Sequence, residues 1–476
     1  MAQIAVIGAG TGALAAAARL AVAGHLVTVF ESSSTYGGAV GRFERDGFAF
    51  DTGPGLLHLP AVHRDLFVKT GREPLEQCVE LVQVDPASRH LFADGTDVLL
   101  PNASRAGVVD ALEAALGGGA GPRWGAFLDR ARDTWDRTRR PLLEEPLPTD
   151  TTPLSRDPYP ALRTGLLRRT ATTLGEVAVR ELRDARLAAL LGSYALSYGF
   201  DPVNAPASAA VLPYMEQTFG SWYVRGGMRA LADAMYRRCL ARKVEFVFSA
   251  EVIAVREKDG RARGVELADG RRIDAEQVIA GAPVPAIPLP HRRTDTGTGR
   301  VVVCLALRGG RPAGAVHRTV VHRTDGDLPM VTVLRPDDPS LVPDRDHESV
   351  TLTVTVPVAD WTDTAASRDA GPAGVFADRV VAAAEAALPG LRGRTLWREV
   401  RTPSDTLRET GSAAVPGPAL AGAGGELLPA PNRSSLPGLF LVGGWAHPGG
   451  GLAHAGMSGA LAAGLIVEGE GFRGSQ

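Results

Sequence analysis

The pattern of apolar positions at the start of the chain predicts a strand, a helix and a second strand in close succession. Residues 3–7 form a short apolar run of the kind that fills a buried parallel strand. A stretch rich in Ala and Leu then continues to Ala23 with helical composition, and Gly24 ends it. Residues 25–30 form a second apolar run that leads directly to Glu31. This order predicts an α/β fold with a Rossmann-type parallel sheet.

Further along the chain the period of the apolar positions changes from helical to alternating. Residues 101–213 show mainly helical patterns that Pro and Gly interrupt. Two alternating segments, residues 252–267 and 272–279, are separated by turn dipeptides and predict a small β-meander. Residues 439–442 predict one more buried strand, followed by a helix of small residues from about 455 to 466.

A second group of alternating segments predicts an antiparallel sheet. These segments are residues 300–308, 318–333 and 349–357, and a helix over residues 375–388 follows them. The chain therefore combines a Rossmann-type parallel sheet carrying a β-meander with an α+β region of antiparallel strands and helices.

Glycine and acid positions in the first segment give it a chemical meaning. Gly8 permits a tight turn from strand to helix, and Gly10 lets the backbone approach a pyrophosphate. The N-terminus of the helix offers unpaired N–H groups to phosphate oxygens, and Glu31 is placed to accept hydrogen bonds from a ribose. The residues predicted to bind a dinucleotide here are Gly8, Gly10, Thr11, Gly12, Ala13 and Glu31.

Composition and charge exclude several classes of function. A chain of 476 residues can hold two domains, and a net charge of −2 gives no general attraction to nucleic acid. The three cysteines lie far apart without the spacing of metal ligands, so we expect no metal site. No apolar run reaches the ~20 residues that a membrane span needs, and the N-terminus lacks the basic start of a signal peptide. We therefore expect a cytoplasmic protein.

The residues after Glu31 carry a family resemblance. Ser32 to Gly37-Gly38, followed by the segment from Phe50 to Gly53-Pro54, resembles the flavoprotein superfamily of phytoene and other carotenoid desaturases and amine oxidases. The resemblance implies non-covalent FAD, with Ser32, Gly37, Gly38, Gly53 and Pro54 beside it. The family's usual Arg after the paired glycine is Ala39 here, and Arg42 is the candidate to replace it.

Two later segments extend the resemblance over nearly the whole chain. In the middle it implies a substrate-adjacent group made of Tyr214, Trp222, Arg225, Gly226 and Gly227, and it places the backbone around Val252 against the adenine. Near the C-terminus a His-Pro-Gly turn is similar to that of carotenoid-desaturase relatives, although Ala446 stands where the family often has a hydroxyl residue. This turn implies flavin contacts from Gly443, Gly444, Gly451, Leu452 and Ala453.

The resemblance also predicts how the chain divides. The FAD-binding domain is discontinuous, over residues 1–75, 210–290 and 405–476. Residues 76–209 and 291–404 form a substrate domain with a helical cap over an apolar tunnel.

Catalytic residues are less well defined than cofactor residues. His447 and Glu216 are the candidates for a polar or acid–base role, although His447 could instead fix its turn. Arg225 and Glu216 either pair with each other or orient a substrate. Basic and apolar positions alternate over residues 162–170. This pattern predicts either a cap helix that lies on a membrane surface or a cap helix that is exposed to solvent.

Three functions fit these features. The first is a phytoene desaturase-like oxidoreductase that transfers hydride between an apolar polyene of isoprenoid type and the flavin, with peripheral contact to a membrane. The second is a tailoring flavoenzyme of natural-product biosynthesis, either a desaturase or an NADPH-dependent reductive cyclase of a polyene macrolactam. The third is a non-catalytic FAD protein. A second dinucleotide motif is missing from the sequence, so NADPH would act as a transient donor at the flavin. The direction of electron flow and the oligomeric state stay open.

Overall fold

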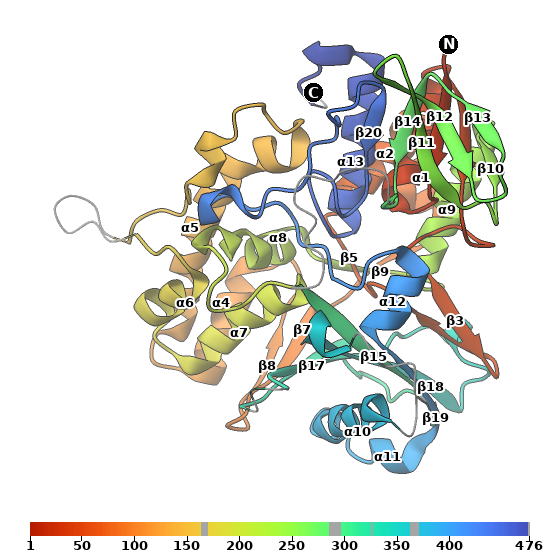
Figure 1. Cartoon of the computed structure of the whole chain (residues 1–476). Helices are drawn as coiled ribbons and strands as arrows, with labels where there is room; N and C mark the ends of the chain where they lie inside the picture. Colours follow the sequence, from red (N-terminus) through yellow and green to blue (C-terminus); the bar gives the residue numbers. More distant parts are fainter. Residues whose placement is uncertain (163–169, 285–296, 325, 327, 362–370, 475–476) are drawn as a thin grey trace.

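A five-stranded parallel sheet forms the upper part of the molecule (Figure 1). The computed structural model describes residues 1–162, 170–284, 297–324, 326, 328–361 and 371–474. The strand order is β10-β2-β1-β14-β20, and every neighbouring pair is parallel. The strands are β1 (Gln3–Ile7), β2 (Leu26–Phe30), β10 (Glu245–Val247), β14 (Gln277–Ala280) and β20 (Leu439–Leu441). The predicted Rossmann-type sheet is confirmed.

Different layers cover the two faces of this sheet. Ile4 and Val6 of β1 pack against three helices, which are α1 (Thr11–Val22), α9 (Met228–Ala241) and α13 (Leu452–Val467). Ala5 and Ile7 point the other way, toward a meander of β11 (Val252–Lys258), β12 (Arg261–Leu267) and β13 (Arg272–Asp274). The predicted segment 272–279 is wrong in its extent, because only its first three residues join the meander and residues 277–280 form β14 of the parallel sheet. The period of two along β1 therefore places a helical layer on one side and a β layer on the other.

A seven-stranded sheet lies below, in the order β19-β15-β18-β17-β16-β7-β8. Its strands are β7 (Ser88–Leu91), β8 (Asp97–Leu100), β15 (Thr298–Arg308), β16 (Arg318–His322), β17 (Met330–Leu334), β18 (His347–Pro357) and β19 (Thr395–Arg401). The pair β16–β7 is parallel and the other pairs are antiparallel. Helix α10 (Pro372–Ala384) covers one face, packed on alternate valines and leucines.

One predicted strand of this sheet is wrong in its extent. Residues 318–333 form two strands, β16 and β17, that pair antiparallel with Arg318 opposite Leu334. Gly326 and Pro329 fall between the two apolar runs, and both residues interrupt a strand.

Helices form a third region on the left of Figure 1, around a core that includes Trp124, Phe127 and Leu187. They are α4 (Arg105–Leu116), α5 (Ala120–Arg139), η1 (Arg140–Glu144), α6 (Leu174–Val177), η4 (Ala178–Leu182), α7 (Ala185–Ser197) and α8 (Val211–Phe219). No helix among the described residues is long and apolar enough to cross a membrane. Of the basic and apolar segment 162–170, residues 163–169 lie outside the described residues.

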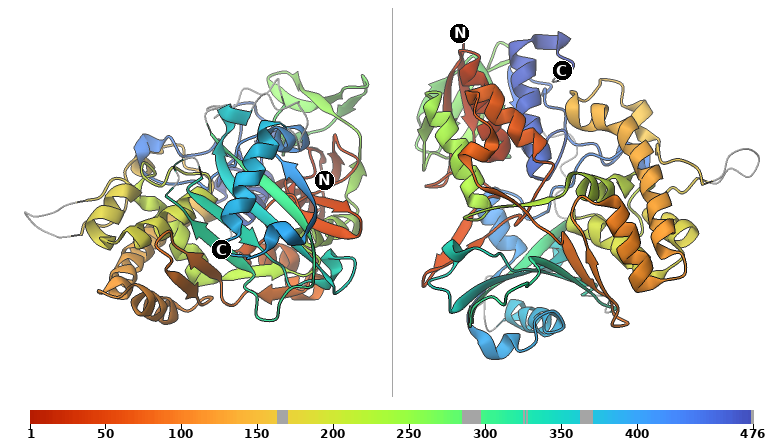
Figure 2. Two further views of the ribbon diagram at one scale, coloured as in Figure 1. Left: turned by 90° about the horizontal axis from the view of Figure 1, so that it is seen from below. Right: turned by 180° about the vertical axis from the view of Figure 1, so that it is seen from behind.

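Smaller elements complete the molecule, and Figure 2 shows the two sheets and the helical region from two further sides. They are the strands β3 (Arg42–Arg45), β4 (Phe48–Asp51), β5 (Leu57–His58), β6 (Leu81–Gln83) and β9 (Ser221–Val224), and the helices α2 (Ala61–Gly71), α3 (Leu75–Cys78), α11 (Leu391–Arg394) and α12 (Pro403–Thr410). The predicted boundaries between the FAD-binding and substrate domains stay a prediction.

Candidate flavin and substrate site

The turn from β1 into α1 leaves an open helix N-terminus. Gly8 has a φ of +83°, in the region that favours glycine, and its N–H donates to the Phe30 carbonyl at 2.7 Å. Gly10 is the N-cap of α1 and offers no side chain to the N–H groups of the first turn, which contains Thr11, Gly12 and Ala13. A Cβ added to Gly10 would meet no atom within 4 Å. Free N–H groups beside open space are what a phosphate oxygen needs.

Glu31 follows β2 and ties two neighbouring loops together. One carboxylate oxygen accepts from the Ala9 N–H at 2.7 Å, and the other accepts from the Ser33 N–H at 2.8 Å and the Ser32 hydroxyl at 3.3 Å. Since an ionised carboxylate has about four lone-pair sites, Glu31 can still accept from a ribose hydroxyl.

The paired glycines Gly37 and Gly38 lie against the same turn. The Gly37 N–H donates to the Ala9 carbonyl at 2.9 Å, and a Cβ on Gly38 would lie 3.1 Å from the Gly10 Cα. Gly38 has a φ of +56°, so a side chain there would be strained as well as crowded. This contact brings the second glycine motif onto the first.

The C-terminal motif meets α1 from the other side. A Cβ on Gly12 would lie 2.7 Å from the Gly443 nitrogen and 2.9 Å from the Ala455 carbonyl oxygen, and a Cβ on Gly459 would lie 2.3 Å from the Gly12 carbonyl oxygen. Helices α1 and α13 therefore touch backbone to backbone. Gly451 is the N-cap of α13 and, like Gly10, provides no side-chain cap. Two uncapped helix N-termini thus converge, with Leu452 and Ala453 in the first turn of the second.

Further contacts hold the C-terminal loop in this position. The Gly443 N–H donates to the Ser458 hydroxyl at 2.7 Å, and Gly444 packs against Pro416, whose Cγ would lie 2.7 Å from an added Cβ. The buried indole nitrogen of Trp445 has no hydrogen-bond partner, and it lies beside Gly443. An orphaned donor, two open helix N-termini and the Glu31 carboxylate together fit a dinucleotide with an anionic centre.

Asp51 organises the segment that contains Gly53 and Pro54. Its carboxylate accepts from the N–H groups of Met228 at 2.9 Å and Arg229 at 3.3 Å, at the start of α9. Burial raises the pKa of Asp51 to about 6, against the hydrogen bonds and Arg42, which lower it. A Cβ on Gly53 would lie 1.9 Å from the Ala39 carbonyl oxygen, so this loop packs directly on the paired-glycine loop.

Arg42, the predicted replacement for the missing arginine, is an exposed residue at the start of β3. Its side chain pairs with Glu44 at 2.7 Å and approaches the Gly226 carbonyl at 3.5 Å.

Gly227, the N-cap of α9, lies directly over Asp51, since an added Cβ would be 2.8 Å from a carboxylate oxygen. Val252 opens β11 and packs in the core that joins the meander to the parallel sheet.

Glu216 lies in a buried cluster of charged and polar side chains. Its carboxylate pairs with Arg318, and its second oxygen lies 3.6 Å from His58 Nε2. Burial alone would raise the pKa of Glu216, but the charge and hydrogen bond of Arg318 hold it below its ordinary value. Burial lowers the pKa of His58, so its ring is mainly neutral at neutral pH.

Arg225 does not pair with Glu216. Its guanidinium bonds Glu80 at 2.7 Å and the Asp337 carbonyl at 3.1 Å, at the surface. The predicted neighbours Tyr214 and Trp222 are half-buried; Tyr214 packs beside Trp135, and the Trp222 indole donates to the Phe219 carbonyl at 2.9 Å.

His447 is completely buried in the C-terminal turn. Its Nε2 is 2.9 Å from the Glu145 carbonyl oxygen, so this nitrogen carries the proton, while Nδ1 has no partner. Burial lowers the pKa of His447 to about 4. No hydrogen bond or ion pair joins it to Glu216 among the described residues. This geometry favours the turn-fixing role over proton exchange.

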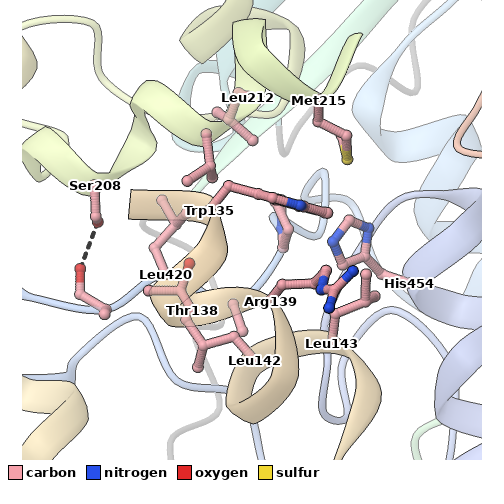
Figure 3. A pocket seen from close by; sticks show the side chains of 14 residues that line it. Trp135, Thr138, Arg139, Leu142, Leu143, Ser208, Leu212, Met215, Leu420 and His454 are labelled. Carbon is pink, nitrogen blue, oxygen red and sulfur yellow. Dashed lines mark hydrogen bonds between the residues drawn. The ribbon is translucent and has the colours of Figure 1, made fainter. Parts of the chain in front are cut away.

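Two cavities lie beside the helical cap. Figure 3 shows a narrow one of about 30 Å³ in which Trp135, Met215 and His454 point toward one another from α5, α8 and α13. A larger cavity of about 670 Å³ lies between α7 and the β16–β17 hairpin, with Leu196, His322 and Met330 in its lining.

Three residues of the site were not predicted from the sequence: Arg318, His58 and Tyr198. Arg318 meets Glu216 across 102 positions of sequence, and no local pattern encodes such a contact. Tyr198 lies at the end of α7, and one of its ring carbons is 3.8 Å from the position of a Cβ on Gly451.

The sequence of this chain is similar to those of known flavoproteins. The model of flavin containing amine oxidoreductases matches residues 14–467. A 4,4'-diapolycopene oxygenase of Methylomonas sp is 28% identical over 98% of both chains. A zeta-carotene-forming phytoene desaturase of Myxococcus xanthus is 31% identical over 60% of this chain and 54% of that protein.

Solved structures show the same fold. A putrescine oxidase has a TM-score of 0.70 at 16% identity, over 98% of this chain and 99% of the other. An oxidoreductase of Methanosarcina mazei has a TM-score of 0.65 at 17% identity, over 96% of this chain and 99% of the other. The chain therefore belongs to the flavin-containing amine oxidoreductase family, as an FAD-dependent oxidoreductase of the phytoene desaturase-like type.

Proposed function

We propose that this enzyme exchanges hydride between FAD and an apolar polyene of the isoprenoid class. The observation that carries the proposal is an apolar cluster between the helical cap and the first turn of α13. Trp135 and Met215 from the cap pack there with Leu59, Val62 and Ala453. The names of the relatives, which are desaturases and an oxygenase of carotenoids, support the same substrate class.

The residues of this chain have separable tasks in such a reaction. FAD, when bound, supplies the two-electron acceptor or donor. The N-termini of α1 and α13 would hold its negative charges, and Glu31 its ribose. The apolar cluster orients the substrate chain and excludes water. Glu216 is ionised and held by Arg318, so we propose that it fixes this guanidinium in the substrate region rather than exchanging protons freely.

Anaerobic reduction by a polyene tests this function. Phytoene, added to the flavin-loaded enzyme without oxygen, should bleach the flavin while the product gains conjugated double bonds that absorb at longer wavelength. A flavin that dithionite reduces but phytoene and 4,4'-diapophytoene leave oxidised would contradict the proposal. Reduction by NADPH in that case would favour a reductive tailoring enzyme.

Contact with a membrane belongs to the same proposal, because an apolar polyene dissolves in the bilayer. Sedimentation with vesicles of anionic lipid should carry part of the enzyme into the pellet at low salt. Protein that stays in the supernatant at every salt concentration would contradict this part.

A further inference from the structure

The seven-stranded sheet has one apolar face and one face with a row of threonines. Val350, Leu352 and Val354 of β18 point toward α10 and are buried there. Successive side chains of a strand alternate, so Thr351 and Thr353 lie on the opposite face. Thr332 of β17 is directly across from Thr353 in the register of the two strands. We call Thr332, Thr351 and Thr353 the threonine face.

The threonine face lies between two covered ends of the sheet. On one side Phe48 and Phe50 of β4 pack over Cys304. On the other side the Thr355 hydroxyl donates to the Leu196 carbonyl of α7 at 3.0 Å. The three threonines between these ends are half-buried, and their hydroxyls make no hydrogen bond to any described residue. Half-buried hydroxyls without protein partners are free to bind a ligand.

Charged residues border the threonine face. Arg318 lies on the same face, since its partner in the register is Leu334, which also pairs with Thr351. Arg318 holds Glu216, and Glu216 is next to His58. An ion pair with so little exposure is costly to bury unless its remaining hydrogen-bonding capacity is used.

Tyr198 connects this region to the predicted flavin loop. The end of α7 is fixed on the sheet, because Thr298 donates to the Gly199 carbonyl at 2.8 Å and Arg300 donates to the Ser197 carbonyl at 2.6 Å. The ring of Tyr198 thus lies between the sheet and Gly451, the N-cap of α13. Burial raises the pKa of Tyr198, so its hydroxyl stays a donor, and it makes no hydrogen bond to a described residue.

We propose that the threonine face, with Tyr198 and Arg318 at its border, binds an oxygen function of the substrate. The inference rests on the proposed function and makes its substrate class narrower: an isoprenoid-type chain that carries a hydroxyl or carbonyl group, rather than a bare hydrocarbon. A hydrocarbon over this face would remove water from several hydroxyls and return no hydrogen bond, which is unfavourable.

The apolar part of such a substrate has room at the end of the same face. His322 of β16 pairs with Met330 of β17. Each lies two positions along its strand from the pair of Val320 and Thr332, so both side chains are on the same face of the sheet as Thr332. Both residues line the cavity of about 670 Å³, and Leu196 lines it as well. The threonine face and the cavity thus share the β16–β17 hairpin, and Tyr198 lies between this hairpin region and Gly451.

Ligand binding to the flavin-loaded enzyme tests the inference. Phytol and phytene have the same branched skeleton and differ in one hydroxyl group, and calorimetric titration in one detergent gives the two values of Kd. The wild type should bind phytol about tenfold more tightly, as expected for one or two hydrogen bonds. The double variant Thr332→Val, Thr353→Val should reduce the preference to about twofold or less, because each Val keeps the shape and removes a hydroxyl.

Thr319→Val is the matched control. Thr319 is buried on β16 with its side chain on the opposite face, so the preference for phytol should stay as in the wild type. Equal binding of phytol and phytene to the wild type, or an unchanged preference in the double variant, would overturn the inference. This test is independent of the test of the proposed function. Even if phytoene fails to reduce the flavin, the ratio of the two Kd values can still be measured.

Discussion

Glu31 is the residue for which the structure gives the most specific expectation. Its carboxylate connects the Ala9 and Ser33 N–H groups while retaining capacity for a ribose. Glu31→Ala should therefore weaken FAD retention at least ~10-fold, the effect of losing a charged hydrogen-bond acceptor and the loop geometry it fixes. The ratio of flavin to protein after gel filtration measures this. Glu245→Ala, on the adjacent strand β10, is the control and should keep its flavin. Full flavin loading of the Glu31 variant would refute the ribose assignment.

The pair of Glu216 and Arg318 gives a second prediction at this scale. Arg318→Met leaves a buried carboxylate without its partner, so it should lower the free energy of unfolding by about 3–5 kcal/mol. The double variant Arg318→Met, Glu216→Gln removes both charges and should recover part of that loss. Urea unfolding of the three proteins gives the comparison. A double variant less stable than Arg318→Met would show that the pair does not act as described.

Single residues also show where prediction from sequence ends. Glu31 could be predicted because it follows a strand at a fixed distance from the glycine turn, so local order encodes its place. Glu216 was singled out, but its partner was not, because Arg318 reaches it from a strand 102 positions further along the chain. Arg225 appeared equally suitable in the sequence, yet its side chain points to Glu80 at the surface.

At the scale of elements, the crossing of α1 and α13 holds the two open helix N-termini together. Gly459→Ala should disrupt it, because the new Cβ would lie 2.3 Å from the Gly12 carbonyl oxygen. We expect a loss of about 1–3 kcal/mol in unfolding free energy, the usual cost of overpacking, with a lower flavin content. Gly456→Ala, on the same helix, is the control, because its nearest contact is the Val62 side chain at 3.3 Å. Equal effects of the two substitutions would contradict this account of the crossing.

Elements with strong local signals were predicted well, and those defined by long-range contacts were not. The β1–α1–β2 unit and the strand before α13 were predicted because apolar runs and glycines mark their ends. Residues 318–333 were taken as one strand because the apolar alternation continues on both sides of the turn. The extent of β16 and β17 is set by their pairing with each other.

For the whole molecule, buried histidines set a pH dependence. Burial lowers the pKa of His63 to about 4, and neither ring nitrogen has a partner. In the unfolded chain the His63 ring takes up a proton as the pH falls below the ordinary histidine pKa of 6.5, whereas in the folded protein it does so only near pH 4. This residue's stabilisation is therefore present above pH 6.5 and falls by about 2 kcal/mol between about pH 7 and about pH 5.

The variant His63→Leu isolates that contribution. Between about pH 7 and about pH 5, the unfolding free energy of this variant should fall by about 2 kcal/mol less than that of the wild type. Urea unfolding at the two pH values measures the difference for both proteins. An identical pH dependence of the variant and the wild type would show that His63 does not stay neutral in the folded state.

The overall plan of two sheets and a helical region was predicted from sequence, but the surface that we propose for the substrate was not. Alternation along β18 shows that valines and threonines lie on opposite faces, yet it does not show which face a helix covers. Only the packing of α10 on the valines shows that the threonines lie on the face opposite this helix.

The central claim is that this chain holds FAD, and a visible absorption spectrum of the purified protein tests it most directly. Bands near ~375 and ~450 nm, retained through gel filtration, are the predicted result for bound oxidised flavin. A protein without these bands that also fails to take up added FAD would contradict the claim.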